Sequence, residues 1–161
     1  MEYILQDKPE GCLFCMKQQE PRGNDRENHI LYRGTGCYML LNRFPYTSGH
    51  VMIAPYQHEA SLEQLDDKAL HEMIALTQIS IATLNKALSP AGFNIGMNLG
   101  KVAGAGVADH IHMHVVPRWQ GDTDFMSICG ETRLIPETLD TTYDKLLPIL
   151  AAELGEGDSA R

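Results

Sequence analysis

The densest group of chemically active side chains lies in residues 109–118, which read Asp-His-Ile-His-Met-His-Val-Val-Pro-Arg. Within this segment His110, His112 and His114 alternate with apolar residues. Side chains alternate between the two faces of an extended strand, so this period of two predicts three imidazoles on one face and apolar groups on the other. Because imidazoles titrate near neutrality, such a face suits proton transfer, nucleophilic attack or metal binding.

Two other interpretations of the histidine repeat compete with this one. A solvated strand face can contain histidine by chance, but three of the seven histidines of the chain fall within five residues, which disfavours this interpretation. Imidazoles at positions i, i+2 and i+4 of a strand can also bind one zinc ion together. A metal centre on the triad itself therefore stays open at this point.

A second reactive pair is Cys12-Leu13-Phe14-Cys15, near the start of the chain. Four cysteines in 161 residues do not make a disulfide scaffold. The Cys-x-x-Cys spacing is typical of a metal or redox pair in a reducing compartment. The alternative is a pair of reduced surface cysteines that hold no metal.

Composition limits the class of protein. A chain of 161 residues fits one domain, and 43% hydrophobic and 21% charged residues are ordinary for a globular protein. The formal charge of −8 argues against binding to nucleic acid or to an anionic membrane. The sequence contains neither an eighteen-residue apolar run nor a basic start followed by an apolar stretch, so the expected location is the cytoplasm.

Hydrophobic patterning predicts short strands around the histidine repeat. Each is a short run of apolar and β-branched residues bounded by glycine, proline or polar residues. These strands are expected over residues 29–33, 37–41, 51–54 and 93–99. The histidine strand follows a loop over 100–109, whose three glycines would let the backbone approach a ligand closely.

The helical segments complete the predicted fold. Apolar residues recur at helical spacing through Ser61–Leu88, which is the one long helical stretch, and a final helix is expected over 136–150. The order of strands, long helix, strands and final helix predicts an α+β fold with an antiparallel sheet. We expect a single domain over residues 1–161, with an N-terminal arm at 1–11 and a flexible tail at 152–161.

The repeat His110-Ile-His112-Met-His114-Val-Val resembles the H-φ-H-φ-H-φ-φ signature of the histidine triad (HIT) superfamily, where φ is a hydrophobic residue. Two further segments resemble the same family and occur in the same order. They are Leu41-Asn42-Arg43-Phe44-Pro45 through Ser48-Gly49-His50-Val51, and Asn98-Leu99-Gly100 with Gly104-Ala105-Gly106. The resemblance covers about residues 12–118. It implies a five-stranded antiparallel sheet with two helices, and a homodimer whose two sheets continue into one.

Within the superfamily, the chain is most similar to the bacterial diadenosine polyphosphate phosphorylase and hydrolase branch. The stretches that carry this similarity are Leu41–Tyr46, Gly92–Gly100 and His114–Asp122. The implied substrate is a nucleotide.

The resemblance implies a catalytic role for four histidines. His112 would attack an α-phosphate and form a nucleotidyl-histidine intermediate, because a neutral imidazole is a good nucleophile near neutral pH. A backbone carbonyl near His110 would fix the tautomer of His112. His114 would stand by the phosphate or the leaving group. His50 would flank the triad and help hold the phosphate, and a surface loop histidine is the alternative.

Nucleotide contacts are also implied by the resemblance. Asn42 matches the family position that binds the ribose hydroxyls, and a turn residue before Pro45 is the alternative. Asn98 matches a phosphate contact. The backbone of Gly104, Ala105 and Gly106 could present N–H groups to phosphate oxygens.

Two features bear on the leaving group. Where the family usually has Gln or a hydroxyl residue, this chain has Gly106, so a side-chain donor is missing and its role would fall to the backbone or to Lys101. Arg118 is expected to counter the charge of a distal phosphate, and Trp119 to stack on a second base. An ordinary salt bridge and a buried tryptophan are the alternatives.

A zinc site is implied by the same resemblance. Some bacterial members, and the related hexose-1-phosphate uridylyltransferases, carry zinc on two N-terminal cysteines, a histidine after the second core strand, and the first triad histidine. The matching residues here are Cys12, Cys15, His58 and His110. A closed tetrahedral Cys₂His₂ site is structural, so this zinc would fasten the N-terminal arm to the sheet and perform no chemistry.

Three hypotheses for function remain. The first is an enzyme that transfers a nucleotidyl group through His112, splitting dinucleoside polyphosphates such as diadenosine tetraphosphate with phosphate or water as acceptor. The second is a purine-nucleotide-binding regulatory protein with incidental hydrolysis of nucleotides or nucleoside phosphoramidates. The third is a hydrolytic metal centre on the triad. The intact His112 favours the enzyme, because a pure binder need not retain the nucleophile.

Overall fold

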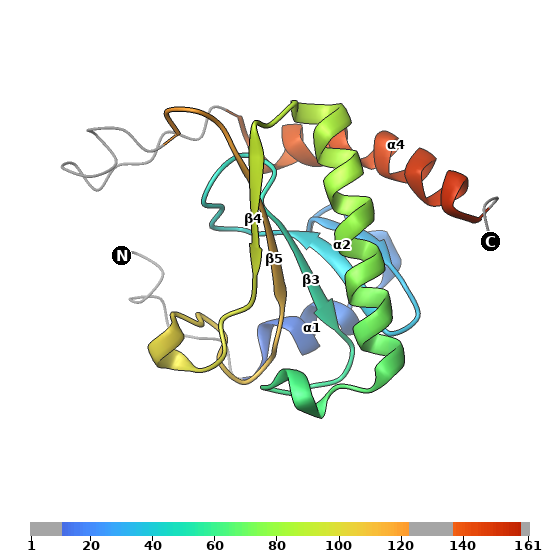
Figure 1. The fold of residues 1–161 in the computed structure, drawn as a ribbon. Coiled ribbons are helices and arrows are strands. Elements are labelled where there is room, and N and C mark those ends of the chain that lie inside the picture. Colours follow the sequence, from blue (N-terminus) through green and yellow to red (C-terminus); the bar gives the residue numbers. More distant parts are fainter. Residues whose placement is uncertain (1–10, 123–136, 159–161) are drawn as a thin grey trace.

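The protein contains one five-stranded antiparallel sheet, seen in a computed structural model that describes residues 11–122 and 137–158. The strands are β1 (Ile30–Arg33), β2 (Cys37–Leu41), β3 (Val51–Pro55), β4 (Gly92–Gly96) and β5 (Met113–Arg118). Their order in the sheet is β1-β2-β3-β5-β4, so β5 lies between β3 and the edge strand β4 (Figure 1). The predicted α+β fold with an antiparallel sheet is confirmed.

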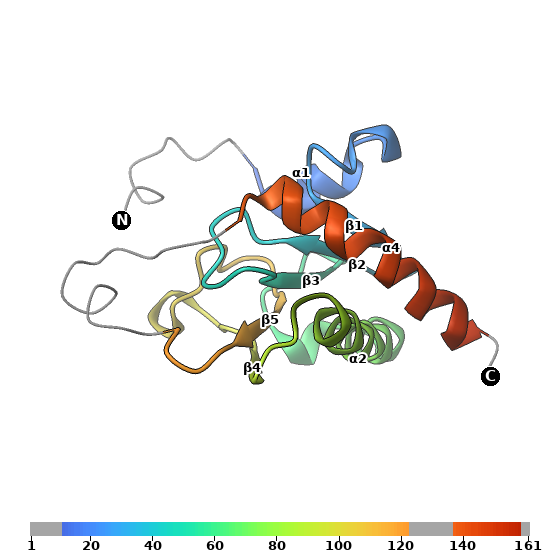
Figure 2. The same ribbon diagram turned by 90° about the horizontal axis from the view of Figure 1, so that it is seen from above.

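Three α-helices cover the sheet. They are α1 (Leu13–Gln19), α2 (Asp67–Leu88) and α4 (Leu139–Asp158). The helices α2 and α4 pack on each other and on one face of the sheet, while α1 lies across the sheet from α2 (Figure 2). Three short 3₁₀ turns, η2 (Arg22–Asn24), η3 (Leu62–Gln64) and η4 (Lys101–Ala103), lie in the connections.

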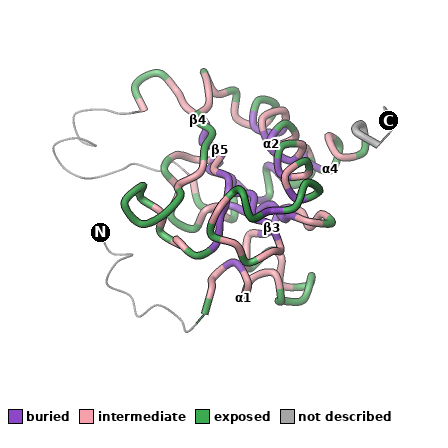
Figure 3. Tube along the Cα trace, turned by 60° about the horizontal axis from the view of Figure 1, so that its bottom comes forward, coloured by how far each residue is buried: buried purple, intermediate pink, exposed green. Residues whose placement is uncertain are grey.

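Both faces of the sheet are buried, and the strands divide their side chains between two cores. Met39, Ile53 and Met113 belong to the larger core beneath α2 and α4. Leu40 and Met52 point to the other face, where they pack with Phe14 of α1 and other apolar side chains. The buried positions therefore concentrate in the central strands (Figure 3). This period-two division is the one expected for strands covered on both sides.

The long helix begins later than the apolar spacing predicts. Instead of starting at Ser61, the chain forms the 3₁₀ turn Leu62–Gln64, and α2 begins at Asp67. The carboxylate of Asp66 accepts a hydrogen bond from the N–H of Ala69 at 2.8 Å. This cap satisfies one of the backbone donors that a helix leaves unpaired at its N-terminus, and it fixes the start of the helix.

The histidine strand is shorter than predicted. The β3–β5 pairing ends at Ile53 and Met113, so His110 and His112 lie immediately before β5 rather than within it. Two residues further along β3 comes Pro55, which has no N–H to donate to a ladder. The N–H of Ile111 instead donates to the carbonyl of Glu59 at 2.7 Å.

The final helix is longer than predicted. It runs to Asp158 rather than ending at Leu150, so residues 152–158, expected in a flexible tail, are helical. Leu154 packs against the larger core, and Glu153 forms an ion pair with Lys86 of α2, which explains the extension. Residues 1–10 and 159–161, which complete the predicted arm and tail, lie outside the described ranges. No helix in the described part of the chain is long and apolar enough to cross a membrane.

A carboxylate on α2 holds the turn between β1 and β2. Glu72 accepts hydrogen bonds from the backbone N–H groups of Thr35 and Cys37, each at 2.8 Å, and from that of Gly36. A Cβ atom on Gly34 would collide with the same carboxylate, so the turn needs glycine at this position. The helix and the hairpin are thereby joined by a charge-assisted contact.

Candidate active site and metal cluster

Two histidines of the triad are buried under the short helix α1. The ring of Phe14 lies 5.1 Å from the ring of His110 and 4.7 Å from that of His112, measured between centroids. His110 is 0% exposed and His112 is 5% exposed. The intervening Ile111 belongs to the opposite core, so the alternation predicted from the sequence persists although these residues precede the strand.

The tautomer of His112 is fixed by the main chain. Its Nδ1 lies 2.9 Å from the carbonyl oxygen of His110, which can only accept, so Nδ1 carries the proton and Nε2 keeps its lone pair. Burial lowers the pKa of His112, which keeps the ring neutral at physiological pH. A neutral imidazole with an oriented, unprotonated Nε2 is the form that a histidine nucleophile requires.

A chain of hydrogen bonds also fixes the tautomers of His50 and His114. The backbone N–H of Tyr46 donates to Nδ1 of His50 at 3.2 Å, and the side-chain amide of Asn42 lies 3.3 Å from the same atom. The proton of neutral His50 is therefore on Nε2, which lies 2.9 Å from Nδ1 of His114. It follows that His114 carries its own proton on Nε2 and presents a hydrogen-bond donor.

Burial keeps both members of this chain uncharged. Burial, with the proximity of His114 as the next cause, lowers the pKa of His50 from 6.5 to about 3. Burial and the proximity of His112 lower the pKa of His114 from 6.5 to about 4. The rings of His112 and His114 lie 4.7 Å apart, so a neutral nucleophile and a neutral donor stand side by side.

The loop before β3 positions His50. Asn42 accepts a hydrogen bond from the N–H of Phe44 at 2.9 Å and so stabilises the turn, while its contact with a ribose stays a prediction. Gly49 has a φ of +78°, and a Cβ atom there would collide with Leu88 of α2. Only glycine therefore lets the chain enter β3 with His50 facing His114.

Cys12, Cys15, His58 and His110 form a compact cluster whose four potential ligand atoms lie within 4.8 Å of one another. The Sγ of Cys12 is 3.3 Å from Nδ1 of His110, and the Sγ of Cys15 is 3.2 Å from Nδ1 of His58. Tetrahedral zinc, with Zn–S near 2.3 Å and Zn–N near 2.0–2.1 Å, places its ligand atoms roughly 3.3–3.8 Å apart. The cluster therefore fits a tetrahedral metal ion.

The tautomer of His110 supports the same conclusion. Nε2 of His110 lies 2.9 Å from the carbonyl of Pro55, so its proton is there and the Nδ1 lone pair faces the cysteines. Burial, and then the hydrogen bond with Cys12, raises the pKa of the Cys15 thiol. A metal cation would hold this thiol as the thiolate that binds metals.

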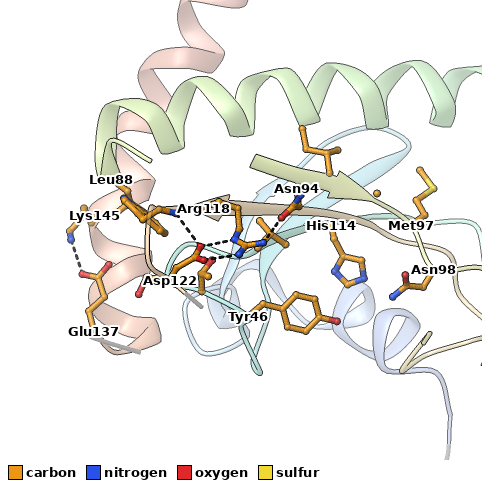
Figure 4. Close-up of a pocket in the computed structure, with 16 residues that line it drawn as sticks. Tyr46, Leu88, Asn94, Met97, Asn98, His114, Arg118, Asp122, Glu137 and Lys145 are labelled. Atoms are coloured by element: carbon orange, nitrogen blue, oxygen red, sulfur yellow. Dashed lines mark hydrogen bonds and ion pairs between the residues drawn. The ribbon is translucent and has the colours of Figure 1, made fainter. Parts of the chain in front are cut away.

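A cleft with a volume of about 850 Å³ opens beside His114 (Figure 4). It runs over β4 and β5 to the start of α4, where Lys145 and Glu137 form an ion pair at 2.7 Å. Asn98, His114, Arg118 and Trp119, all singled out by the sequence, line it.

Arg118 forms a salt bridge with Asp122, and its contact with a phosphate stays a prediction. Its Nε and one terminal nitrogen each lie 2.6 Å from a carboxylate oxygen of Asp122, and the other terminal nitrogen lies 2.6 Å from the side-chain oxygen of Asn94. The backbone N–H of Trp119 donates to the same carboxylate at 3.1 Å.

Other residues singled out by the sequence lie apart from this cleft. His112, Asn42 and the segment 104–106 are not among its lining residues. The N–H groups of Gly104 and Ala105 already donate to the carbonyls of Lys101 and Gly100, at 3.0 and 3.4 Å. The residues predicted from the sequence thus fall into three groups. These are the cluster of two cysteines and two histidines, the pair His112 and His114 with His50 beside it, and the residues that line the cleft.

The sequence reasoning missed several contributors. The N–H of Tyr46 and the carbonyl of Pro55 act through the main chain, which leaves no signal in side-chain patterns. Lys145 and Glu137 fall on or near the predicted final helix, but nothing in their spacing connects them with the histidines.

Comparisons with known proteins agree with these observations. Residues 24–121 match the model of the HIT domain family. The chain is 43% identical over 122 residues to a Mycobacterium tuberculosis protein named AP-4-A phosphorylase, a match that covers 76% of this chain and 63% of that protein. The chain thus spans less than two thirds of the length of that relative.

Two further proteins extend the comparison. The chain is 30% identical over 110 residues to the adenosine 5′-monophosphoramidase hnt1 of Schizosaccharomyces pombe, covering 67% of this chain and 74% of that protein. Its fold is similar to the crystal structure of a Zn-bound histidine triad family protein from Mycobacterium smegmatis. The TM-score is 0.70 and the identity 28%, over 94% of this chain and 98% of that one.

The lowered pKa values of His50 and His114 predict a stability that falls below about pH 6.5. The unfolded chain binds protons at these imidazoles from about pH 6.5 downward, whereas the folded protein binds them only near pH 4 and pH 3. Between these limits unfolding takes up protons, so the free energy of unfolding decreases as the pH falls. Thermal unfolding should show a Tm that decreases from pH 6.5 to 4.5.

The control for this prediction is His114→Asn, which removes one of the two titrating groups. Its Tm should depend less steeply on pH than that of the unsubstituted protein. Each Tm is compared with that of the same protein at pH 7.5, where the imidazoles are neutral in both states and only packing differs. Equal slopes for the two proteins would contradict the assignment.

Proposed function

This chain belongs to the HIT domain family, and from that premise we propose that it is an enzyme that cleaves dinucleoside polyphosphates through a nucleotidyl intermediate on His112. The observation that carries the proposal is the bond from Nδ1 of His112 to the carbonyl of His110, which aims an unprotonated Nε2 away from the main chain. A relative at 43% identity is named AP-4-A phosphorylase, which supports a diadenosine polyphosphate as substrate.

The proposed reaction has two displacements at one phosphorus atom. The lone pair of His112 Nε2 forms a bond to the α-phosphorus, and the bond to the bridging oxygen breaks, with its electron pair leaving on the polyphosphate. His114 donates a hydrogen bond from Nε2 to the oxygen on which charge develops. Phosphate or water then attacks the same phosphorus, and the N–P bond breaks to restore the lone pair of His112.

The His110 carbonyl and His50 support these steps in the proposal without contacting the phosphorus. When Nε2 is bonded to phosphorus, the His112 ring is cationic, and the carbonyl that accepts its Nδ1–H stabilises that charge. His50 orients His114 by donating to its Nδ1. We further propose nucleotide contacts from Asn42, Asn98, the 104–106 backbone, Arg118 and Trp119.

A second candidate is a purine-nucleotide-binding regulatory protein whose hydrolysis of nucleotides or nucleoside phosphoramidates is incidental. The 30% identity to an adenosine 5′-monophosphoramidase favours keeping it. The two candidates differ in the rate with which diadenosine tetraphosphate is turned over.

Incubation with diadenosine tetraphosphate, with and without inorganic phosphate, tests the enzyme. Cleavage at an α-phosphate should release ATP in both cases, together with ADP when phosphate is the acceptor and AMP when water is. The variant His112→Asn should keep the Tm within a few degrees and lose several orders of magnitude in kcat, because it lacks the nucleophile.

The two results decide the proposal together. Turnover by His112→Asn within tenfold of the unsubstituted protein would disprove the covalent mechanism. Efficient hydrolysis of adenosine phosphoramidate with no turnover of diadenosine tetraphosphate would replace it with the second candidate.

We propose that the cysteine–histidine cluster holds one structural zinc ion, and a histidine triad family protein of similar fold, which is Zn-bound, supports the proposal. Zinc bound there would join the N-terminal segment to the start of β5 and leave the chemistry to His112. The fully reduced cysteines that it needs are typical of a reducing compartment, which supports a cytoplasmic location.

About one zinc per chain should be found by elemental analysis, and a strong chelator should lower the Tm, because metal binding links segments far apart in the sequence. Cys15→Ser should cause a similar loss of zinc and of stability. Cys37→Ala, which changes a buried thiol outside the cluster, should keep the zinc. A metal-free protein of full stability, or Cys12 bonded to Cys15, would rule the site out.

We also propose a homodimer that pairs through β4. This strand forms the edge of the sheet, and Ile95 on it is 45% exposed. An unpaired edge with an exposed apolar residue favours pairing with another strand, which would continue the sheet into a second copy.

Light scattering should give about twice the chain mass of 17.9 kDa. Ile95→Lys should convert the dimer to monomer, because a charge on a pairing edge opposes association. Leu62→Lys, a matched change at an exposed leucine of η3, should leave the dimer intact. A monomeric unsubstituted protein at micromolar concentration would disprove the pairing.

A further inference from the structure

Tyr46 lies against the two histidines that share a hydrogen bond in the site. The centroid of its ring is 4.6 Å from that of His50 and 6.0 Å from that of His114, on which it is stacked. Its backbone N–H donates to Nδ1 of His50 at 3.2 Å, so the main chain as well as the ring is held beside the imidazoles. The residue is nevertheless 46% exposed. Tyr46 is therefore fixed at the site and still accessible to a ligand.

The hydroxyl of Tyr46 is turned toward the open side of the histidine pair. It points past His114 in the direction of Asn98 (Figure 4). All three residues line the same opening. A phenol hydroxyl donates a hydrogen bond as a neutral group, as His114 does from its Nε2. Two neutral donors, one on a ring of β5 and one on the loop before β3, thus face the same space.

The leaving group of the proposed reaction needs more donors than His114 and the loop before β5 supply. It is a polyphosphate, and negative charge moves onto it as the P–O bond breaks. His114 offers one N–H, at Nε2, because its Nδ1 accepts from His50. In the loop, the N–H groups of Gly104 and Ala105 already donate to main-chain carbonyls, and Gly106 has no side chain to donate. A second neutral donor beside His114 would stabilise the charge that develops.

We propose that the hydroxyl of Tyr46 donates a hydrogen bond to the β-phosphate of the substrate, which is the first phosphate of the leaving group. This rests on the proposed function, because attack by His112 on the α-phosphorus decides which phosphate comes next. The β-phosphate is joined to that phosphorus through the oxygen to which His114 donates, so it lies beside the ring on which Tyr46 is stacked. The hydroxyl keeps its proton while the Nε2–P bond forms and the P–O bond breaks, and the electron pair leaves on the polyphosphate.

Turnover of two substrates by Tyr46→Phe tests the contact. This variant removes only the hydroxyl, since the ring and the backbone N–H that bonds to His50 remain. The kcat/KM for diadenosine tetraphosphate should fall roughly ten- to a hundredfold, which is the usual effect of losing a hydrogen bond to a charged group. The 4-nitrophenyl ester of AMP has no phosphate in its leaving group, so its kcat/KM should change by less than about threefold. Tyr32→Phe, the same exchange on β1, where the ring packs against the larger core, should leave both values unchanged.

Binding in the absence of turnover isolates the β-phosphate. The His112→Asn variant lacks the nucleophile, so calorimetry can measure the Kd of AMP and of ADP, which differ only by this phosphate. Adding Tyr46→Phe to that variant should raise the Kd of ADP about tenfold and leave the Kd of AMP within about twofold. Adding Tyr32→Phe instead should change neither Kd.

These results separate the Tyr46 contact from the reaction itself. If Tyr46→Phe lowers both kcat/KM values by the same factor or changes neither, or if it affects AMP and ADP binding alike, its hydroxyl does not contact the β-phosphate. The proposal is then wrong, and the covalent mechanism is judged by His112→Asn alone. If the unsubstituted protein turns over neither substrate, but Tyr46→Phe weakens the binding of ADP and not of AMP, the reaction is wrong and the contact with the β-phosphate stands.

Discussion

The hydrogen bond from Nε2 of His110 to the carbonyl of Pro55 is the contact on which the arrangement of the site depends. It joins the end of β3 to the segment that enters β5, where the regular ladder has already stopped. Because this bond holds the ring proton on Nε2, the lone pair of Nδ1 of His110 faces the cluster of cysteines and His58. The carbonyl of the same residue accepts from His112. One residue thereby lies between the cluster that could hold a metal ion and the proposed nucleophile on the same face of the sheet.

The second constraint on the site is that its imidazoles are uncharged. The chain carries a net charge of −8, and burial keeps His50, His112 and His114 uncharged. The anionic substrate that we propose would therefore meet oriented N–H donors rather than a cluster of cations. Donors of this kind stabilise charge at a defined position, which suits a transition state in which charge moves to a bridging oxygen. Two cations that line the neighbouring cleft, Arg118 and Lys145, are paired with carboxylates.

Side-chain patterns in the sequence predicted the features that depend on which side chains face the core. The period of two placed His110, His112 and Ile111 on their correct faces, although the ladder itself begins only at Met113. The apolar spacing of α2 was predicted, but its start depends on the capping carboxylate of Asp66, which spacing does not show. The Cys-x-x-Cys spacing indicated a metal or redox pair, but its two distant histidine partners were identified by family resemblance rather than by pattern.

The parts that could not be predicted arise from the main chain or from contacts between distant residues. The carbonyl of Pro55 and the amide of Tyr46 have no side-chain signature. Glu72 bonds to a turn 35 or more residues away, and Arg118 pairs with Asp122, which lies beyond the end of β5. A main-chain contact of this kind also sets the polarity of the His50–His114 pair. Because the donor is the peptide N–H of Tyr46, it is present whichever residue occupies that position, except proline. The backbone thus determines that His50 donates to His114 and not the reverse. The side chain at position 46 can therefore change in evolution without reversing this hydrogen bond.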